Sequence, residues 1–69
     1  MKIGNRIKER RKALNMPIEV LAEKINKNRA TVYRYESGYI ENLPLNILKP
    51  LCEALDCSIA YLLDTEEKN

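Results

Sequence analysis

Residues 17–38 have the sequence PIEVLAEKINKNRATVYRYESG, and this stretch decides the fold. Its first part carries four apolar residues at the i, i+3, i+4, i+7 spacing of one helix face, namely Ile18, Leu21, Ala22 and Ile25. We therefore expect a helix over residues 17–25, with Pro17 in the first turn, where its missing N–H has no partner to lose. Asn26 follows at the point where the chain leaves the helix, and asparagine tolerates the left-handed conformation common there.

A second helix is predicted directly after this turn. Asn28 offers a side-chain oxygen to the first free N–H groups of the new helix. Val32 and Tyr35 give the helix an apolar side, and Gly38 supplies a left-handed cap after Ser37. The opposite side is left free for solvent or a ligand and carries three polar residues, Arg29, Tyr33 and Arg34.

The N-terminal segment also has a helical pattern. Residues 3–14 are predicted to form a helix with one apolar stripe and cationic borders. The apolar positions are Ile3, Ile7 and Leu14, and the cationic positions are Arg6, Arg10 and Arg11.

The C-terminal half predicts a loop over residues 39–43 and two further helices. The first has an inward face made of Leu45, Leu48, Leu51, Cys52 and Leu55. Pro50 lies inside this pattern and has no N–H to donate, so either residues 45–49 form a separate turn or the helix kinks there. Ser58 is expected to cap a last short helix whose inward residues are Ile59, Leu62 and Leu63.

Length and composition fit one domain. The chain has 69 residues, of which 45% are hydrophobic and 32% charged, an ordinary globular balance. No stretch alternates with the period of two that β-strands show. We predict an all-α fold, a compact bundle of about five short helices over residues 1–64, with a flexible polar tail over residues 65–69. No apolar run suits a membrane helix or a signal peptide, so we expect a cytoplasmic protein.

Two cysteines and no histidine restrict the chemistry of the chain. Cys52 and Cys57 are too few ligands for a four-coordinate zinc site, and we expect both to be reduced, buried and structural. The commonest general base is missing, and no glycine-rich phosphate loop occurs. The sequence therefore predicts no metal, no cofactor, no small-molecule substrate and no enzymatic activity.

Charge is divided unevenly along the chain. Residues 1–34 contain ten basic and three acidic residues, a net charge of +7, whereas residues 35–69 contain two basic and seven acidic residues, a net charge of −5. The N-terminal half is therefore suited to approach a polyanion, provided that its basic residues share one face.

Two short helices separated by about three residues, beside a cationic first helix, have the geometry of a helix-turn-helix. Separated blocks between residues 3 and 63 resemble the Cro/C1-type (XRE-like) helix-turn-helix repressors of phages and bacteria, which have a lambda repressor-like fold. The blocks are IGNRI at 3–7, LNM at 14–16, EVLAEKI at 19–25, RATVYRYESG at 29–38, ALDCS at 54–58 and YLL at 61–63.

This resemblance implies a sequence-specific transcriptional regulator, a repressor, that binds double-stranded DNA as a homodimer. The residues implied to contact bases are Arg29, Ala30, Tyr33 and Arg34. The residues implied to contact phosphates are Arg10, Ile18 through its backbone, Lys27, Asn28, Thr31, Ser37 and Tyr39. The resemblance further implies a structural pair between Arg11 and Glu36, and a dimer contact at Ile59 and Tyr61.

The sequence departs from the family at the start of the second helix. Many relatives have a hydroxyl cap followed by glutamine where this chain has Pro17 and Ile18. Ile18 cannot brace a side chain of the recognition helix, so Arg29 is expected to lack that support. An alternative function is a protein-interaction module or antitoxin-like partner that keeps the fold and binds through the acidic C-terminal half.

Overall fold

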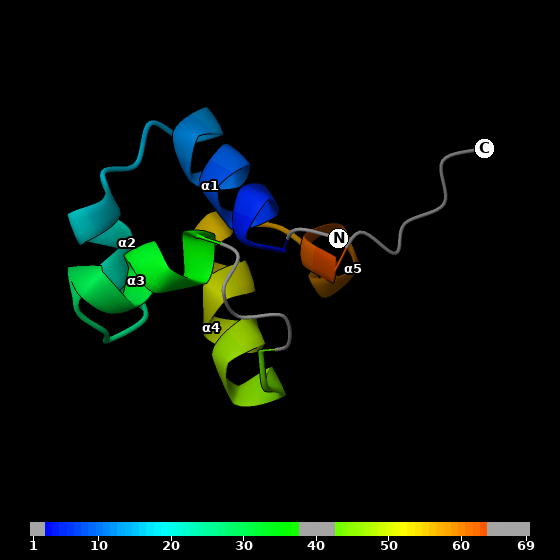
Figure 1. The fold of residues 1–69 in the computed structure, drawn as a ribbon. Coiled ribbons are helices and arrows are strands. Elements are labelled where there is room, and N and C mark those ends of the chain that lie inside the picture. Colours follow the sequence, from blue (N-terminus) through cyan, green and yellow to red (C-terminus); the bar gives the residue numbers. More distant parts are fainter. Residues whose placement is uncertain (1–2, 38–42, 64–69) are drawn as a thin grey trace.

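The computed structural model describes residues 3–37 and 43–63, and these form a compact all-α arrangement with no strand among them. In Figure 1, α2 and α3 lie side by side, and α5 lies on the opposite side of the molecule from α2. The five helices are α1 (Ile3–Ala13), α2 (Ile18–Lys24), α3 (Arg29–Glu36), α4 (Leu45–Leu55) and α5 (Ile59–Leu63). The predicted fold class is confirmed. The predicted Gly38 cap, residues 39–42 of the predicted loop over residues 39–43, and the tail over residues 65–69 lie outside the described residues.

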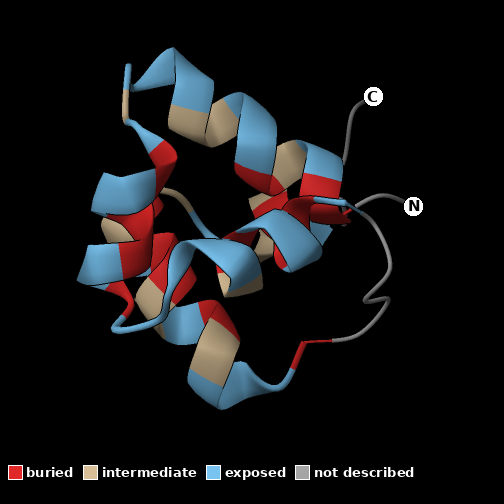
Figure 2. Ribbon diagram, turned by 60° about the vertical axis from the view of Figure 1, so that its left-hand side comes forward, coloured by how far each residue is buried: buried red, intermediate tan, exposed pale blue. Residues whose placement is uncertain are grey.

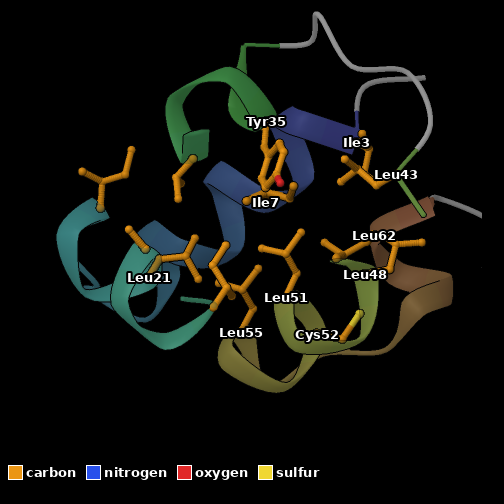
Figure 3. Close-up of a cluster of buried hydrophobic side chains, with 14 residues drawn as sticks. Ile3, Ile7, Leu21, Tyr35, Leu43, Leu48, Leu51, Cys52, Leu55 and Leu62 are labelled. Atoms are coloured by element: carbon orange, nitrogen blue, oxygen red, sulfur yellow. The ribbon is translucent and has the colours of Figure 1, made fainter. Parts of the chain in front are cut away.

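Every helix contributes at least one fully buried side chain to a single core. The burial pattern in Figure 2 places the red segments of the helices toward one another and the pale blue segments outward. The described residues with no exposed surface are Ile7, Leu21, Val32, Leu51, Leu55 and Leu62. Figure 3 shows Ile7, Leu21, Leu51, Leu55 and Leu62 between the helices. Because the core is shared by all five helices, the position of α2 and α3 depends on α1 and α4 behind them.

Local side-chain chemistry explains where the helices begin and end. Asn28 Oδ1 accepts a hydrogen bond of 2.8 Å from the backbone N–H of Thr31, and Ser58 Oγ accepts one of 3.0 Å from the N–H of Tyr61. Both predicted N-caps are therefore confirmed. Among the described residues, three non-glycine residues adopt the left-handed conformation just after the ends of α1, α2 and α4: Asn15, Asn26 and Asp56, with φ values of 54°, 61° and 53°.

The helix α4 continues through Pro50, which excludes the separate turn, one of the two predicted alternatives. Proline removes the hydrogen bond that the carbonyl group of Asn46 would otherwise accept. Asn46 is exposed, so water can hydrate this carbonyl group, which lowers the cost of keeping one helix.

Three leucines predicted to face the core are exposed instead: Leu14 by 38%, Leu45 by 59% and Leu63 by 37%. Each lies at or just beyond a helix end, where the helical periodicity of the sequence no longer gives the direction of the side chain. Helix α1 ends at Ala13, so Leu14 belongs to the turn. Leu45 begins α4 and is replaced in the core by Leu43, which precedes the helix.

The two cysteines lie at the end of α4, where Cys52 is buried, Cys57 is half-buried and neither forms a disulfide. Burial, with a contribution from the neighbouring Cys57, raises the pKa of the Cys52 thiol to about 11. Cys52 is therefore a protonated thiol at neutral pH. None of the described helices is both long and apolar enough to cross a membrane.

Candidate nucleic-acid interface

The turn between α2 and α3 is closed by backbone hydrogen bonds that the left-handed Asn26 makes possible. The N–H of Lys27 donates to the carbonyl of Ala22 at 2.8 Å, and the N–H of Asn26 donates to the carbonyl of Glu23 at 3.1 Å. This pair of bonds is a Schellman motif. Asn28 then caps α3 directly, so only residues 25–28 connect the two helices. The orientation of α3 on α2 is set by this short connection.

Helix α3 has one buried face and one exposed face. Val32 and Tyr35 are buried against the core, with exposed fractions of 0% and 7%. The four residues implied to contact bases all lie on the exposed side, namely Arg29, Ala30, Tyr33 and Arg34. Tyr33 is 58% exposed. These residues occupy positions i, i+1, i+4 and i+5, which lie on the same side of a helix, so they form one solvent-exposed face.

The residues implied to contact phosphates are in several different environments. Lys27 and Asn28 are exposed where the chain enters α3. The hydroxyl of Thr31 donates to Asn28 Oδ1 at 2.9 Å, and the hydroxyl of Ser37 donates to the carbonyl of Arg34 at 2.8 Å. The side chain of Ile18 is buried, which leaves only its backbone for a ligand. Tyr39 lies outside the described residues.

Arg10 is placed differently from the sequence prediction. Its Nε donates to the carbonyl of Leu55 at 2.8 Å, and its Nη2 donates to the carbonyl of Asp56 at 2.9 Å. The guanidinium therefore binds the carbonyl groups at the C-terminal end of α4, where a cation also interacts favourably with the helix dipole. This contact ties α1 to α4. The structure thus gives Arg10 a structural contact, and its role as a phosphate ligand stays a prediction.

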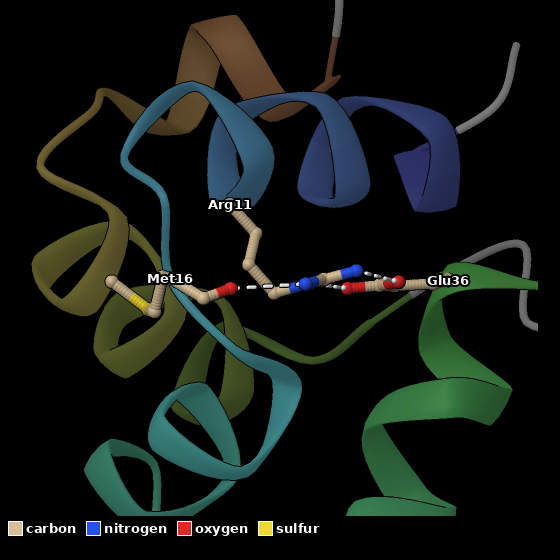
Figure 4. Close-up of polar contacts among 3 residues, drawn as sticks. All are labelled: Arg11, Met16 and Glu36. Carbon is tan, nitrogen blue, oxygen red and sulfur yellow. Dashed lines mark hydrogen bonds and ion pairs between the residues drawn. The ribbon is translucent and has the colours of Figure 1, made fainter.

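A buried ion pair joins α1 to the end of α3. Arg11 Nε lies 2.7 Å from Glu36 Oε2, and Arg11 Nη2 donates to Glu36 Oε1 at 3.2 Å, so the contact is bidentate. A third N–H of Arg11 donates to the carbonyl of Met16 at 3.0 Å (Figure 4). The side chains are only 12% and 6% exposed, and the hydrogen bond to Glu36 raises the pKa of Arg11. The pair implied by the resemblance is present.

Gly4 is a further structural residue, which was not among the residues predicted from the sequence. A Cβ atom at this position would lie 2.5 Å from the carbonyl oxygen of Tyr35 and 2.6 Å from that of Glu36. Helix α1 therefore approaches the last turn of α3 more closely than any side chain would allow. A glycine inside a predicted helix is the signal that marks such a position.

A second ion pair crosses the outer surface of the helix-turn-helix. Arg29 Nη1 donates to Glu19 Oε2 at 3.1 Å, which links the first residue of α3 to the second residue of α2. Both side chains are exposed, by 62% and 60%. A hydrogen bond from its own backbone N–H, followed by the bond from Arg29, lowers the pKa of the Glu19 carboxyl. Arg29 was expected to lack support from α2, and the structure shows that Glu19 provides it.

The helix α5 carries the two residues implied to contact a second subunit. Ile59 and Tyr61 are half-buried and pack against the core. The guanidinium carbon of Arg6 lies 4.5 Å from the centre of the Tyr61 ring, a cation–π contact between α1 and α5.

Within the described residues, no group of three or more His, Cys, Asp or Glu side chains is placed to hold a metal ion.

Known proteins share this arrangement over most of the chain. The sequence profile of the helix-turn-helix family matches residues 7–62. A crystal structure of the P22 c2 repressor protein, in complex with synthetic operator 9T in the presence of Tl+, is similar with a TM-score of 0.84. The two chains are 29% identical, and the similarity covers 96% of this chain and 98% of that chain. No curated protein matches the chain.

Two crystal structures of HppE in complex with substrate, one with Fe(II) and one with Co(II), are also similar. Each has a TM-score of 0.80 and 28% identity, and the similarity covers 87% of this chain. The same similarity covers only 34% and 33% of the HppE chains, so it concerns a minor part of those proteins. The profile match, together with the agreement with the repressor over almost the whole of both chains, shows that this protein belongs to the helix-turn-helix family of the Cro/C1 type.

Proposed function

We propose that this protein is a sequence-specific DNA-binding transcriptional regulator, a repressor, that inserts α3 into the major groove of double-stranded DNA. One observation carries the proposal. The four side chains Arg29, Ala30, Tyr33 and Arg34 share the exposed face of a short helix whose other face is buried. The match to a repressor in complex with its operator supports the same conclusion.

The chemistry of this face suits the edges of base pairs. An arginine side chain can donate two hydrogen bonds to O6 and N7 of guanine, and an alanine methyl group can contact the methyl group of thymine. Arg29 and Arg34 lie near the two ends of α3, so they would read different base pairs of one half-site. Tyr33 lies between them and contributes a phenol that can donate to a base or a phosphate.

Contacts to the DNA backbone would set the position of α3. Lys27 and Asn28 are exposed beside the start of α3, where cationic and polar groups can bind phosphate oxygens. The backbone of Ile18, the hydroxyl groups of Thr31 and Ser37, which would exchange their intramolecular hydrogen bonds for phosphate oxygens, and Tyr39 complete the proposed set. Arg10 is left out because its guanidinium binds the end of α4.

We further propose that the protein binds DNA as a homodimer through Ile59 and Tyr61. The helix α5 lies away from α2, so a contact there would leave the DNA-binding face of each subunit open (Figure 1). A dimer with two-fold symmetry binds two half-sites whose centres lie about 34 Å apart, which is one turn of DNA. Replacing Ile59 with aspartate should weaken binding to a two-half-site operator strongly and binding to one half-site little.

As a DNA-binding regulator, the protein would act in the cytoplasm and would need no substrate or cofactor. The alternative function, a protein-interaction module or antitoxin-like partner, uses the acidic C-terminal half instead of α3. No specific contact among the described residues favours it, whereas the exposed arginines of α3 favour DNA.

Selection of bound sequences from random double-stranded DNA tests the proposal. We expect enrichment of one motif with two-fold symmetry, and an affinity that falls by orders of magnitude between about 50 and 200 mM salt because bound phosphates release counterions. Failure to enrich any sequence, together with capture of a protein partner by the C-terminal half, would exclude the DNA-binding function and establish the alternative.

A further inference from the structure

The Glu19–Arg29 contact is the one ion pair between described residues that lies on the proposed DNA-binding face. It joins Nη1 of Arg29 to Oε2 of Glu19 at 3.1 Å, across the turn between α2 and α3. Both side chains are about three-fifths exposed. Exposed ion pairs contribute little to folding stability, because water screens the charges and the long side chains lose entropy when they pair. The stability of the fold therefore does not account for this contact.

An acidic side chain in this place has a cost for DNA binding. Glu19 is exposed close to the residues that would meet phosphates, and a carboxylate repels a polyanion. Hydrogen bonds from its own backbone N–H and from Arg29 hold the pKa of Glu19 below its usual value, so the charge is present at neutral pH. The pairing with Arg29 neutralises the charge locally and gives the carboxylate a defined partner.

The pair restricts where the guanidinium of Arg29 can go. An unpaired arginine at the start of α3 could swing to the nearest phosphate, and such a contact carries no sequence information. One of the five guanidinium N–H groups is donated to Glu19, which leaves four for a base edge. A planar guanidinium held in one orientation can meet guanine O6 and N7 with two parallel hydrogen bonds.

We infer that Glu19 is a specificity-determining residue that positions Arg29 to read guanine and keeps it away from the phosphates. The inference rests on the proposed DNA-binding function and deepens it. Glu19 acts through Arg29 and touches no base itself. The support that Ile18 cannot give to the recognition helix therefore comes from the next residue along α2.

The test compares the motifs selected by four proteins, namely the wild type, Glu19→Ala, Arg29→Ala and the double variant. In Glu19→Ala we expect the preference for guanine at one position of each half-site to fall at least about 5-fold, the value of one good base contact. Affinity for non-specific DNA should stay equal or rise, because a negative charge is removed. In the Arg29→Ala background, the Glu19→Ala substitution should leave the motif unchanged.

Glu23→Ala is the matched control, since Glu23 is also an exposed acid of α2, one turn further along. It should raise non-specific affinity in the same way and leave the guanine preference intact. Glu19→Gln keeps an oxygen acceptor for Arg29 and should retain most of the preference. Thermal melting of each variant establishes that the fold is unchanged.

The outcomes separate this inference from the proposed function. If the wild type and Glu19→Ala enrich the same motif, Glu19 has no positioning role, although the protein still binds DNA. The same conclusion follows if Glu23→Ala loses the preference for guanine to the same extent as Glu19→Ala. If Arg29→Ala leaves the wild-type motif unchanged, Arg29 does not read a base and the inference is overturned as well. If the wild type enriches no sequence, both the proposed function and the inference are overturned.

Discussion

Two arginine–glutamate pairs occur among the described residues of this small protein, and the same chemical groups serve different purposes in them. The Arg11–Glu36 pair is bidentate and almost wholly buried, at 12% and 6% exposure. The Arg29–Glu19 pair makes a single contact and is mostly exposed, at 62% and 60%. Burial decides which of the two stabilises the fold. The buried pair is costly to break, while the exposed pair adds little stability and leaves the other N–H groups of Arg29 accessible to a ligand.

The largest effect is expected from breaking the buried pair. Glu36→Ala leaves the guanidinium of Arg11 buried without its carboxylate, which should cost about 3 to 5 kcal/mol of unfolding free energy. Urea unfolding followed by circular dichroism measures this change. Glu23→Ala removes an exposed acid and serves as the control. A double variant, Arg11→Met with Glu36→Leu, should recover much of the loss, and equal stability of Glu36→Ala and the wild type would disprove the structural role.

Gly4→Ala tests the close contact beside that pair. The new Cβ would meet two backbone carbonyl oxygens at 2.5 and 2.6 Å, so α1 and α3 must move apart at a cost of about 1 to 3 kcal/mol. Alanine is otherwise the better helix former, and Asn5→Ala, at an exposed position of α1, should be neutral or slightly stabilising. A melting temperature of Gly4→Ala at or above that of Asn5→Ala would contradict the predicted clash.

Arg34→Ala tests the exposed face, where we expect an effect on DNA and none on folding. Discrimination at one base position of each half-site should fall by about 1 to 3 kcal/mol, while the unfolding free energy changes by less than about 0.5 kcal/mol. Lys24→Ala is the control, because this exposed lysine of α2 should affect all sequences alike. An unchanged selected motif would remove Arg34 from the base-reading set.

Arg10→Ala distinguishes a structural arginine from a phosphate ligand. Losing two hydrogen bonds to the end of α4 should lower the unfolding free energy by about 1 kcal/mol, with little effect on DNA affinity below the melting temperature. Lys8→Ala, at an exposed position of α1, should leave stability unchanged. The opposite result, full stability with weaker binding to every DNA sequence, would restore the phosphate contact expected from the sequence.

The smallest effect concerns the titration of Glu19. Its folded pKa is lowered, so its contribution to stability is present above the usual carboxyl pKa and is lost as the pH falls through the folded value. Because the group is exposed, we expect almost no change in melting temperature over this range. NMR titration should show that Arg29→Ala raises the pKa of Glu19 toward its usual value. An identical pKa in both proteins would mean that the pair does not persist in solution.

Local patterns were the reliable part of the sequence analysis. The N-caps at Asn28 and Ser58 and the left-handed Asn26 were predicted correctly, because each depends on the chemistry of a few neighbouring residues. The errors at Leu14, Leu45 and Leu63 occur at helix ends. A period of 3.6 residues gives the direction of a side chain only while the helix continues, and tertiary packing decides where it stops.

The sequence by itself determined the all-α fold, the two helices around Asn26 and the exposed side of the second helix with Arg29, Tyr33 and Arg34. These follow from spacing and capping, which act within a few residues. Only the tertiary structure decided that Arg10 binds the end of α4 and that Glu19 pairs with Arg29. Both contacts join different helices, and no sequence spacing specifies the distance between two elements whose positions depend on a core shared by all five helices.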